Sequence, residues 1–176
     1  MKIKNINVHL TEEELDKRIR EMAAQISKDF DGEPITLICI LKGSVFFTCD
    51  LAKRISNPVE LDFMKVSSYG SGTSSSGRVK IEQDLDENIE GKNVLVVEDI
   101  IDSGRTLSYL LDILGRRNPK SLKLCTLLDK PDRRVVEVNV DYVGFEIPDE
   151  FVVGYGFDYN QKYRDLPYIG YVEIEE

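Results

Sequence analysis

Apolar residues recur along the chain with two spacings, and segments of the two kinds follow one another. Residues 11–30 carry apolar side chains at helical spacing, and Thr11 and Glu14 at the start have the spacing of a capping box. The apolar face consists of Leu15, Ile19, Met22, Ala23, Ile26 and Phe30. Residues 35–41 are almost continuously apolar, which predicts a buried strand, and a second helix is expected from there to about residue 54.

The middle of the chain predicts a hairpin. Residues 59–69 and 78–85 have the pattern of strands, and the segment between them, GSGTSSSG, contains only Gly, Ser and Thr. Such a segment has high backbone freedom and nothing apolar to bury. Residues 59–85 are therefore expected to form a β-hairpin with a flexible tip at residues 70–77.

The second half of the chain continues the alternation of strand and helix. The pattern predicts buried strands at 92–99 and 121–130, a helix at 103–117, and extended pieces at 142–158 and 168–174. Buried strands that alternate with helices predict a single α/β domain over residues 1–176, with a mostly parallel, twisted sheet flanked by helices. Ligands bind such sheets beyond the carboxyl ends of the strands.

Charge and apolar content narrow the classes of function. The formal net charge of the 176 residues is −9, so nonspecific nucleic-acid binding is not expected. The longest apolar run, residues 35–41, is far shorter than the ~20 residues of a membrane span. The N-terminal segment MKIKNINVHL lacks the apolar core of a signal peptide, and a cytoplasmic location is expected.

The cysteines and the histidine do not indicate a disulfide or a metal site. Cys39, Cys49 and Cys125 are irregularly spaced within apolar segments, so we expect buried free thiols, which suit a reducing compartment. His9 is the only histidine, and without a cysteine pair a structural zinc site is not expected.

Polar residues concentrate where the strand at 92–99 passes into the next helix. This turn consists of Ser103, Gly104, Arg105 and Thr106. Backbone N–H groups at a helix start converge and favour an anion, and hydroxyl groups add donors, so the turn is expected to bind a phosphate. Glu98 and Asp99 suit ribose hydroxyls or a Mg²⁺ shell, and Asp102 could accept or donate a proton. The alternative is a capped helix with solvated acids.

Two further segments bear on phosphate binding. LKGS, at 41–44, places Lys42 at another strand-to-helix turn, which suits a second anionic group. GTSSSGR is superficially like a P-loop, but Arg78 and Val79 replace its Lys and its Ser or Thr, and a strand follows, so a P-loop is rejected. The tip of the hairpin is expected to be either a lid that excludes water or a plain loop.

Several motifs together resemble type I phosphoribosyltransferases. The segment VLVVEDIIDSGRTL is similar to the phosphoribosyl diphosphate signature of that family. The hypoxanthine–guanine branch of the family has segments similar to LKGS, SSYGSG, LLDKPDRR and GFEIPDEFVVGYGFDYNQKYRDLPYIG. The resemblance spans roughly residues 35–173, and the long C-terminal segment is its most branch-specific part.

The resemblance implies an activity and a role for each matching residue. The activity is purine salvage, by Mg²⁺-dependent transfer of the 5-phosphoribosyl group from phosphoribosyl diphosphate to N9 of hypoxanthine or guanine, with release of pyrophosphate. The 5′-phosphate and ribose would be held by Glu98, Asp99, Asp102, Ser103, Gly104, Arg105 and Thr106, and pyrophosphate by Lys42, Gly43 and Arg164. The purine would contact Lys130, Phe151, Val152 and Asp158, Mg²⁺ would bind Glu98, Asp99 and Asp158, and a lid would close through Ser68 and Tyr69.

The same resemblance implies features of the fold and the partners. A lid hairpin at about 59–85 is expected, with a small hood formed by the N- and C-terminal segments that includes a purine-binding stretch at about 146–173. The family often has a cis peptide at the LKG turn, and its members are usually dimers or tetramers. The expected partners are the two small-molecule substrates and further copies of the chain, without nucleic acid or membrane.

Elementary chemistry agrees with several of these roles. Lys130 has donors and no acceptor, so it favours a 6-oxo over a 6-amino purine, and adenine should be rejected. Asp102 is placed to remove a proton at purine N7, as the catalytic general base. Lys42, Arg164 and Mg²⁺ would neutralise the departing pyrophosphate. Guanine and xanthine remain alternatives as further substrates.

Other classes of function fit the sequence less well. A nucleotide- or RNA-binding regulator on the same fold should show a basic face, and the charge of −9 argues against one. Lys130, together with the segment at 151–158, argues against a related enzyme for adenine or a pyrimidine. A receiver-like signalling domain would spread its acids over several strand ends and would lack the Ser-Gly-x-Thr turn.

Overall fold

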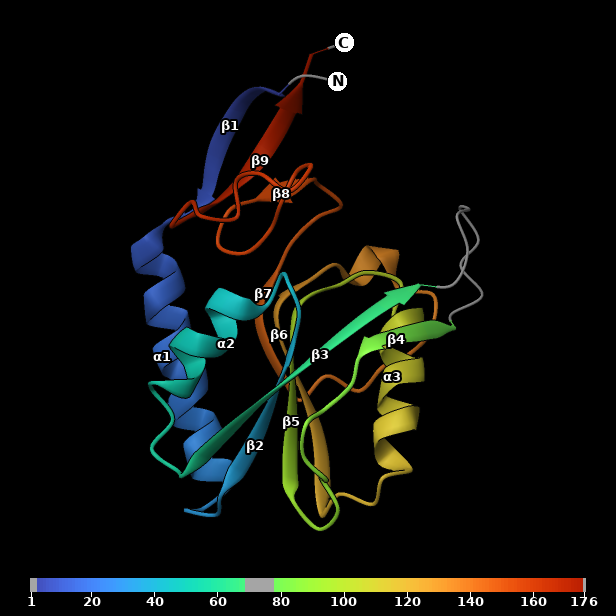
Figure 1. The fold of residues 1–176 in the computed structure, drawn as a ribbon. Coiled ribbons are helices and arrows are strands. Elements are labelled where there is room, and N and C mark those ends of the chain that lie inside the picture. Colours follow the sequence, from blue (N-terminus) through green and yellow to red (C-terminus); the bar gives the residue numbers. More distant parts are fainter. Residues whose placement is uncertain (1–2, 69–77, 176) are drawn as a thin grey trace.

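The centre of the molecule is a six-stranded sheet. Its strands are β2 (Ile35–Ile40), β3 (Val59–Ser68), β4 (Val79–Gln83), β5 (Asn93–Ile101), β6 (Ser121–Asp129) and β7 (Tyr142–Glu146). The structure, a computed structural model, describes residues 3–68 and 78–175. The strands lie in the order β4-β3-β2-β5-β6-β7, and every neighbouring pair is parallel except β3 and β4 (Figure 1). The predicted, mostly parallel α/β sheet is confirmed.

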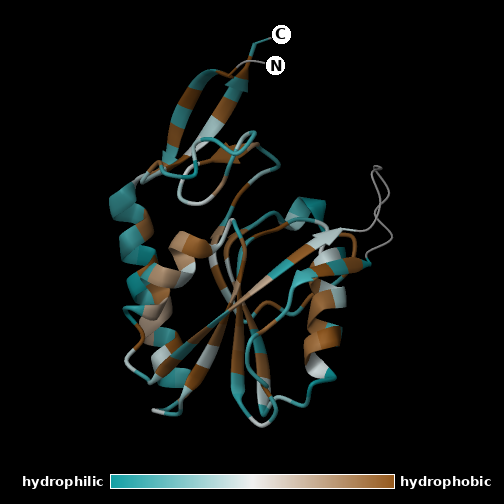
Figure 2. Ribbon diagram, viewed as in Figure 1, coloured by the Kyte–Doolittle hydropathy of each residue, from teal (hydrophilic) through white to brown (hydrophobic). Residues whose placement is uncertain are grey.

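Helices cover both faces of this sheet. They are α1 (Glu12–Asp29), α2 (Val45–Ala52) and α3 (Arg105–Gly115), with α1 and α2 on one face and α3 on the other (Figure 1). On β5, Leu95 and Val97 pack into the core under α1 and α2, whereas Val94 and Val96 pack into the core under α3. A continuous apolar run is therefore a strand buried on both faces, and the brown strands at the centre of Figure 2 show the result.

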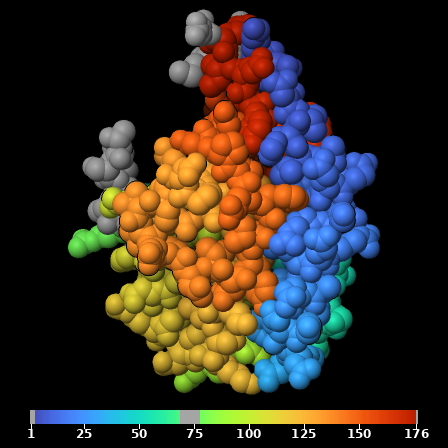
Figure 3. All heavy atoms as spheres, turned by 180° about the vertical axis from the view of Figure 1, so that it is seen from behind, coloured from blue at the N-terminus to red at the C-terminus, as the bar shows by residue number. Residues whose placement is uncertain are grey.

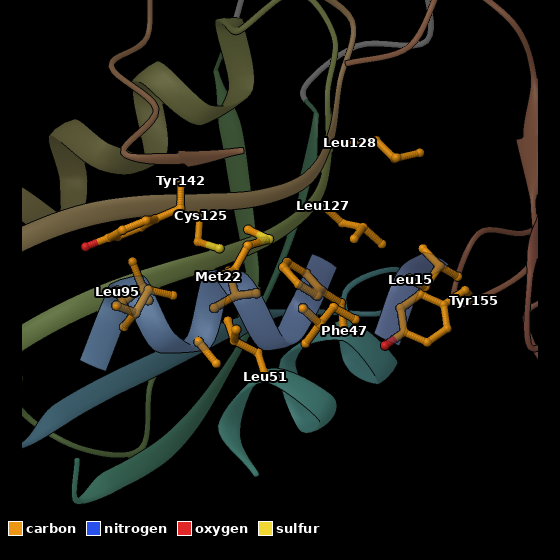
Figure 4. Close-up of a cluster of buried hydrophobic side chains, with 14 of the residues drawn as sticks. Leu15, Met22, Phe47, Leu51, Leu95, Cys125, Leu127, Leu128, Tyr142 and Tyr155 are labelled. Atoms are coloured by element: carbon orange, nitrogen blue, oxygen red, sulfur yellow. The ribbon is translucent and has the colours of Figure 1, made fainter. Parts of the chain in front are cut away.

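The larger core lies between the sheet, α1 and α2. Leu15 and Met22 of α1 meet Phe47 and Leu51 of α2 there (Figure 4). Each such side chain contributes about 1.5–3 kcal/mol by leaving water. The capping box predicted for α1 is present, because Thr11 Oγ1 accepts a hydrogen bond of 3.1 Å from the Glu14 N–H.

A second sheet joins the two ends of the chain. Its antiparallel strands are β1 (Ile3–Leu10), β9 (Ile169–Ile174) and β8 (Val152–Val153), in that order. It projects from one end of the molecule, as the views from the front and from behind agree (Figure 1, Figure 3). The sequence pattern did not predict β1, because Leu10 is the one residue of this strand that is buried. His9 is structural, since its ring stacks on Tyr171 with the ring centroids 4.3 Å apart.

The hairpin predicted at 59–85 is present as the antiparallel pair β3 and β4, with Ser68 opposite Val79. Tyr69 and the whole of the flexible tip predicted at 70–77 lie outside the described residues. The action of this hairpin as a lid stays a prediction.

The cysteines correct one expectation. Cys39 and Cys125 are buried free thiols, but Cys49 is exposed, because it lies on the outer side of the short helix α2. An apolar neighbourhood in sequence did not predict which side of the helix faces solvent. Within residues 3–68 and 78–175, no helix has the length and apolar character needed to cross a membrane.

Candidate active site

The turns that follow β2, β5 and β6 lie beside one another, because these parallel strands are neighbours in the sheet. The turn after β2 lies close to the end of β5. A Cβ atom added to Gly43 would lie 1.7 Å from Asp99 Oδ2, so a larger residue at this position would require the Asp99 carboxylate to move. The peptide bond between Leu41 and Lys42 is cis, as the resemblance implied for this turn.

The turn after β5 has the geometry expected of an anion site. Gly104 is the N-cap of α3 with φ +82°, and the Arg105 N–H donates to Ser103 Oγ at 3.3 Å. A cavity of about 180 Å³ opens here, lined by Glu98, Ile100, Ile101, Asp102, Ser103, Gly104, Thr106 and Leu107. The first turn of α3 thus faces a space with two hydroxyl groups and backbone N–H groups around it.

Glu98 and Asp99 form an acid pair at the end of β5. Burial raises the pKa of Glu98 well above its usual range, and the neighbouring Asp99 charge raises it further. Burial also raises the pKa of Asp99, against the opposing effects of its hydrogen bonds and of the Arg164 charge. Two carboxylates withdrawn from water in this way fit a bound cation, because a positive charge offsets both the desolvation and the repulsion. Within the described residues, no group of three or more His, Cys, Asp or Glu side chains forms a metal site.

Lys130 follows β6 and lies between two carboxylates. It is 9% exposed, and its Nζ is 3.9 Å from Asp102 Oδ1 and 3.5 Å from Asp149 Oδ1. The predicted base and the predicted purine-reading lysine therefore lie together. Asp149 was not among the predicted site residues, although it stands in the branch-specific segment two residues before Phe151.

Phe151 and Val152 lie where β8 begins. Phe151 is 47% exposed, and its ring meets the edge of Tyr159 with the centroids 5.8 Å apart. Val152 is buried, and β8 is the edge strand of the three-stranded sheet. An exposed aromatic ring beside a strand edge offers both a stacking surface and backbone hydrogen-bonding groups.

Lys42, Asp158 and Arg164 are brought together through one further residue. Lys42 Nζ donates to Gln161 Oε1 at 3.2 Å, and the Gln161 N–H donates to Asp158 Oδ2 at 2.7 Å. Arg164 Nη2 lies 3.0 Å from Asp158 Oδ1. Gln161 was missed because its side chain carries no charge, although it stands in the branch-specific C-terminal segment.

The strand ends and the segment after β8 meet at Gly156. A Cβ atom there would lie 2.1 Å from the Gly43 carbonyl oxygen, so the segment that carries Asp158 and Arg164 lies against the turn that carries Lys42. Ser68 is exposed at the end of β3, and its predicted partner Tyr69 is outside the described residues.

Together these features define an α/β protein with a glycine-containing turn at a helix start, a half-buried acid pair and cationic side chains at the carboxyl ends of its strands. Residues 10–160 match the family model described as "Phosphoribosyl transferase domain". The chain belongs to this family, as the sequence motifs predicted.

Individual proteins of this kind are similar to the chain over nearly its whole length. The chain is 59% identical over 169 residues to the hypoxanthine phosphoribosyltransferase of Buchnera aphidicola subsp. Schizaphis graminum, covering 95% of this chain and 96% of that protein. It is 54% identical to the bifunctional protein TilS/HprT of Listeria monocytogenes, covering 96% of this chain but 26% of that protein. A solved hypoxanthine-guanine phosphoribosyltransferase from Bacillus anthracis, with HEPES in its active site, is 53% identical with a TM-score of 0.93, covering 98% of this chain and all of that one.

Proposed function

We propose that this protein transfers the 5-phosphoribosyl group of phosphoribosyl diphosphate to N9 of hypoxanthine and of guanine, forming IMP and GMP and releasing pyrophosphate. The observation that carries the proposal is the 3.9 Å approach of Lys130 Nζ to Asp102 Oδ1 at the edge of an anion-binding turn. It puts a group that reads purine O6 beside a group that can accept the N7 proton. The names of the similar proteins support the same reaction.

In this proposal, the turn at the start of α3 binds the 5′-phosphate. Backbone N–H groups come from Ser103, Gly104, Arg105 and Thr106, and the hydroxyl groups of the Ser and the Thr add donors. The acids Glu98 and Asp99 lie at the same strand end and take the ribose hydroxyls. Asp102 is 49% exposed at its side chain, which leaves it free to meet the base.

The purine binds between Lys130 and the strand edge at β8. Lys130 donates to O6, which excludes a 6-amino group at that position. Asp102 accepts the proton from N7 as the base attacks the sugar. Phe151 stacks on the ring, the Val152 backbone reads its edge, and Asp158 lies on the same side. The three-stranded terminal sheet serves as the hood of the site.

Pyrophosphate leaves between Lys42, the Gly43 N–H and Arg164. We propose Mg²⁺ as the cofactor, which would supply positive charge to offset that of the leaving pyrophosphate. Glu98 and Asp99 would hold one ion, and Asp158 a second one. Since no three-residue acidic cluster exists within the described residues, substrate oxygens and water would complete each shell, as is usual for Mg²⁺. Ser68 and Tyr69 would bring the hairpin over the sugar and exclude water.

We also propose that the chain forms a homodimer or homotetramer in the cytoplasm. The short helix α2 is mostly apolar, and Phe46 on it is 42% exposed, with Leu61 of β3 45% exposed. Exposed apolar side chains of this size suit contact with another copy. The buried free thiols of Cys39 and Cys125 suit a reducing compartment.

The test is a direct assay. The purified protein is incubated with phosphoribosyl diphosphate, Mg²⁺ and one base at a time, and any nucleotide formed is separated by chromatography. The five bases are hypoxanthine, guanine, xanthine, adenine and uracil. IMP and GMP are expected, without AMP or UMP. The rate with xanthine shows whether xanthine is a further substrate. Binding of phosphoribosyl diphosphate by a folded protein that makes no nucleotide from any base would contradict the proposal and favour a nucleotide-binding regulator.

A further inference from the structure

The segment that follows Lys130 lies directly on the anion-binding turn. The N–H groups of Val135 and Val136 both donate to the Ser103 carbonyl oxygen, at 2.9 and 3.0 Å. A Cβ atom on Gly104 would lie 2.5 Å from the Val136 carbonyl oxygen. The phosphate turn after β5 is therefore shaped by the loop after β6.

Arg134 is the side chain that connects these two strand ends. Its Nη2 forms an ion pair with Asp129, which is 8% exposed and ends β6. Its Nε donates to the Asp102 carbonyl oxygen at 3.2 Å. Its Cδ would lie 3.0 Å from a Cβ atom on Gly104, so the stem of the arginine packs against the turn. The guanidinium group thus holds both strand ends at once.

The two residues that Arg134 contacts are closely connected to the groups proposed to meet the purine. Asp129 immediately precedes Lys130, and the bonded carbonyl belongs to Asp102 itself. A backbone bond of 3.0 Å from the Lys130 N–H to the Ile101 carbonyl oxygen runs alongside. Because Lys130 and Asp102 must meet two neighbouring groups of one purine, O6 and N7, a displacement of about 1 Å between them can cost about 100-fold in rate.

We propose that Arg134 is a positioning residue that fixes Lys130 relative to Asp102 and thereby sets both the rate and the choice of the 6-oxo purine. This inference rests on the proposed function and adds a residue that contacts neither the phosphate nor the base in it. A planar guanidinium can bond a carboxylate and a carbonyl in one fixed geometry, whereas an ammonium on a flexible stem cannot hold the same fork.

The test compares Arg134→Gln and Arg134→Lys with the wild type. Arg134→Lys keeps a positive charge for Asp129, so its melting temperature is expected to stay near that of the wild type. In both variants, kcat with hypoxanthine is expected to fall roughly 10- to 100-fold. The ratio of kcat/KM for hypoxanthine to that for adenine is expected to fall at least about 10-fold, whereas the Kd for phosphoribosyl diphosphate, measured by calorimetry, changes less than about threefold.

Arg116→Gln is the matched control, because Arg116, the C-cap residue of α3, has a side chain that is 78% exposed and forms an ion pair with Asp112. It removes the same charge and is expected to leave kcat and selectivity unchanged. Should Arg134→Gln fail to fold, Arg134→Lys decides alone. Wild-type selectivity in a folded Arg134 variant, whatever its rate, overturns the inference, since a merely structural role would slow all bases equally. A wild-type protein without transferase activity would instead overturn the proposed function itself.

Discussion

Asp102 and Lys130 come from different strands, and they differ in how firmly they are held. Lys130 is almost buried and has Asp149 within 3.5 Å, whereas the Asp102 side chain is 49% exposed. The ammonium group of Lys130 is thus held by its surroundings, whereas the Asp102 carboxylate is open to solvent. This difference agrees with the roles proposed above, in which Lys130 selects a 6-oxo purine and Asp102 accepts a proton from it.

Asp102→Asn should separate chemistry from binding. The amide keeps the size of the side chain but cannot accept a proton, so kcat is expected to fall about 10²- to 10⁴-fold, the usual contribution of a general base. The Kd for phosphoribosyl diphosphate should change little, because the turn at 103–106 is intact. Steady-state kinetics and calorimetry measure the two effects. Asp112→Asn on the exposed side of α3 is the control. Full turnover by Asp102→Asn would show that Asp102 is not the general base.

Lys130→Gln should change the choice of base. A glutamine carries both a donor and an acceptor, so it no longer opposes a 6-amino group. The preference for hypoxanthine over adenine, measured as the ratio of kcat/KM, is expected to fall by about 10-fold or more. An unchanged ratio with a reduced rate would mean that Lys130 supports the fold and does not read O6.

At the scale of residues, the pattern alone predicted the polar turn at 98–106, because one strand end and one helix start place its groups without help from elsewhere. Lys130 and Arg164 stand in other segments, and their roles were predicted from the resemblance. Asp149, Gln161 and Arg134 were missed, because each acts through a contact with a segment distant along the chain. Only the folded molecule brings those segments together.

The turn into α3 depends on one glycine. Gly104 has φ +82°, and a Cβ atom would meet the Val136 carbonyl oxygen at 2.5 Å. Gly104→Ala is therefore expected to lower the free energy of unfolding by about 1–3 kcal/mol and to weaken phosphoribosyl diphosphate binding. Chemical denaturation and calorimetry test this.

Gly115→Ala provides the control for this substitution. A Cβ atom there meets only Leu122 Cδ2, at 3.9 Å, within the last turn of α3. It should be neutral or stabilise by about 0.4–1 kcal/mol, because alanine restricts the unfolded chain. Equal losses of stability in the two variants would contradict the explanation by backbone geometry.

The end of α1 is tied to β7 by a hydrogen bond that depends on pH. Tyr142 Oη donates to Asp29 Oδ2 at 2.7 Å, and this bond is the main cause that lowers the pKa of Asp29 below 3.8. Its contribution to stability is therefore present above pH 3.8 and is lost as the pH falls through the lower pKa of the folded state.

Tyr142→Phe should reveal that dependence. At pH 7 the variant is expected to lose about 1 kcal/mol of unfolding free energy, the usual net value of a hydrogen bond. The difference from the wild type should shrink as the pH approaches 3. Urea denaturation at several pH values measures it, with Tyr109→Phe on the exposed face of α3 as the control. A difference that is constant with pH would assign the loss to packing alone.

At the scale of elements, the sequence predicted the central sheet and its helices because their apolar spacing reflects burial. β1 was not predicted, since it is stabilised by pairing with β9 and not by burial of one face. Pairing partners that stand at opposite ends of a chain leave no local pattern. The extended pieces expected at 142–158 are β7, which pairs with β6, and the short β8, which pairs with β9.

For the whole molecule, substrate and metal should stabilise the fold together. The raised pKa values of Glu98 and Asp99 indicate that burial disfavours their charges, and a phosphate-rich substrate adds more negative charge beside them. Phosphoribosyl diphosphate at 100 times its Kd is expected to add about 2.7 kcal/mol, or roughly 5–10 °C in melting temperature, when Mg²⁺ is present. With a chelator the shift should be much smaller.

The variant Glu98→Gln tests whether the acid pair makes stabilisation by the substrate depend on Mg²⁺. By removing one of the two carboxylates, it should reduce the difference between the shifts with Mg²⁺ and with the chelator. A shift in melting temperature that is the same with and without Mg²⁺ in the wild type would argue against the metal role proposed for the acid pair.

The pairing of β1 with β9 has a consequence for the order in which the molecule is made. Ile3 lies opposite Ile174, so the terminal sheet requires segments separated by almost the whole chain. On the ribosome the central sheet can assemble while β9 is still being synthesised, but β1 must wait for its partner. β8, which pairs with β9 and carries Val152, waits as well. A nascent chain should therefore form the turn at 103–106 before β8 and Val152 take their places.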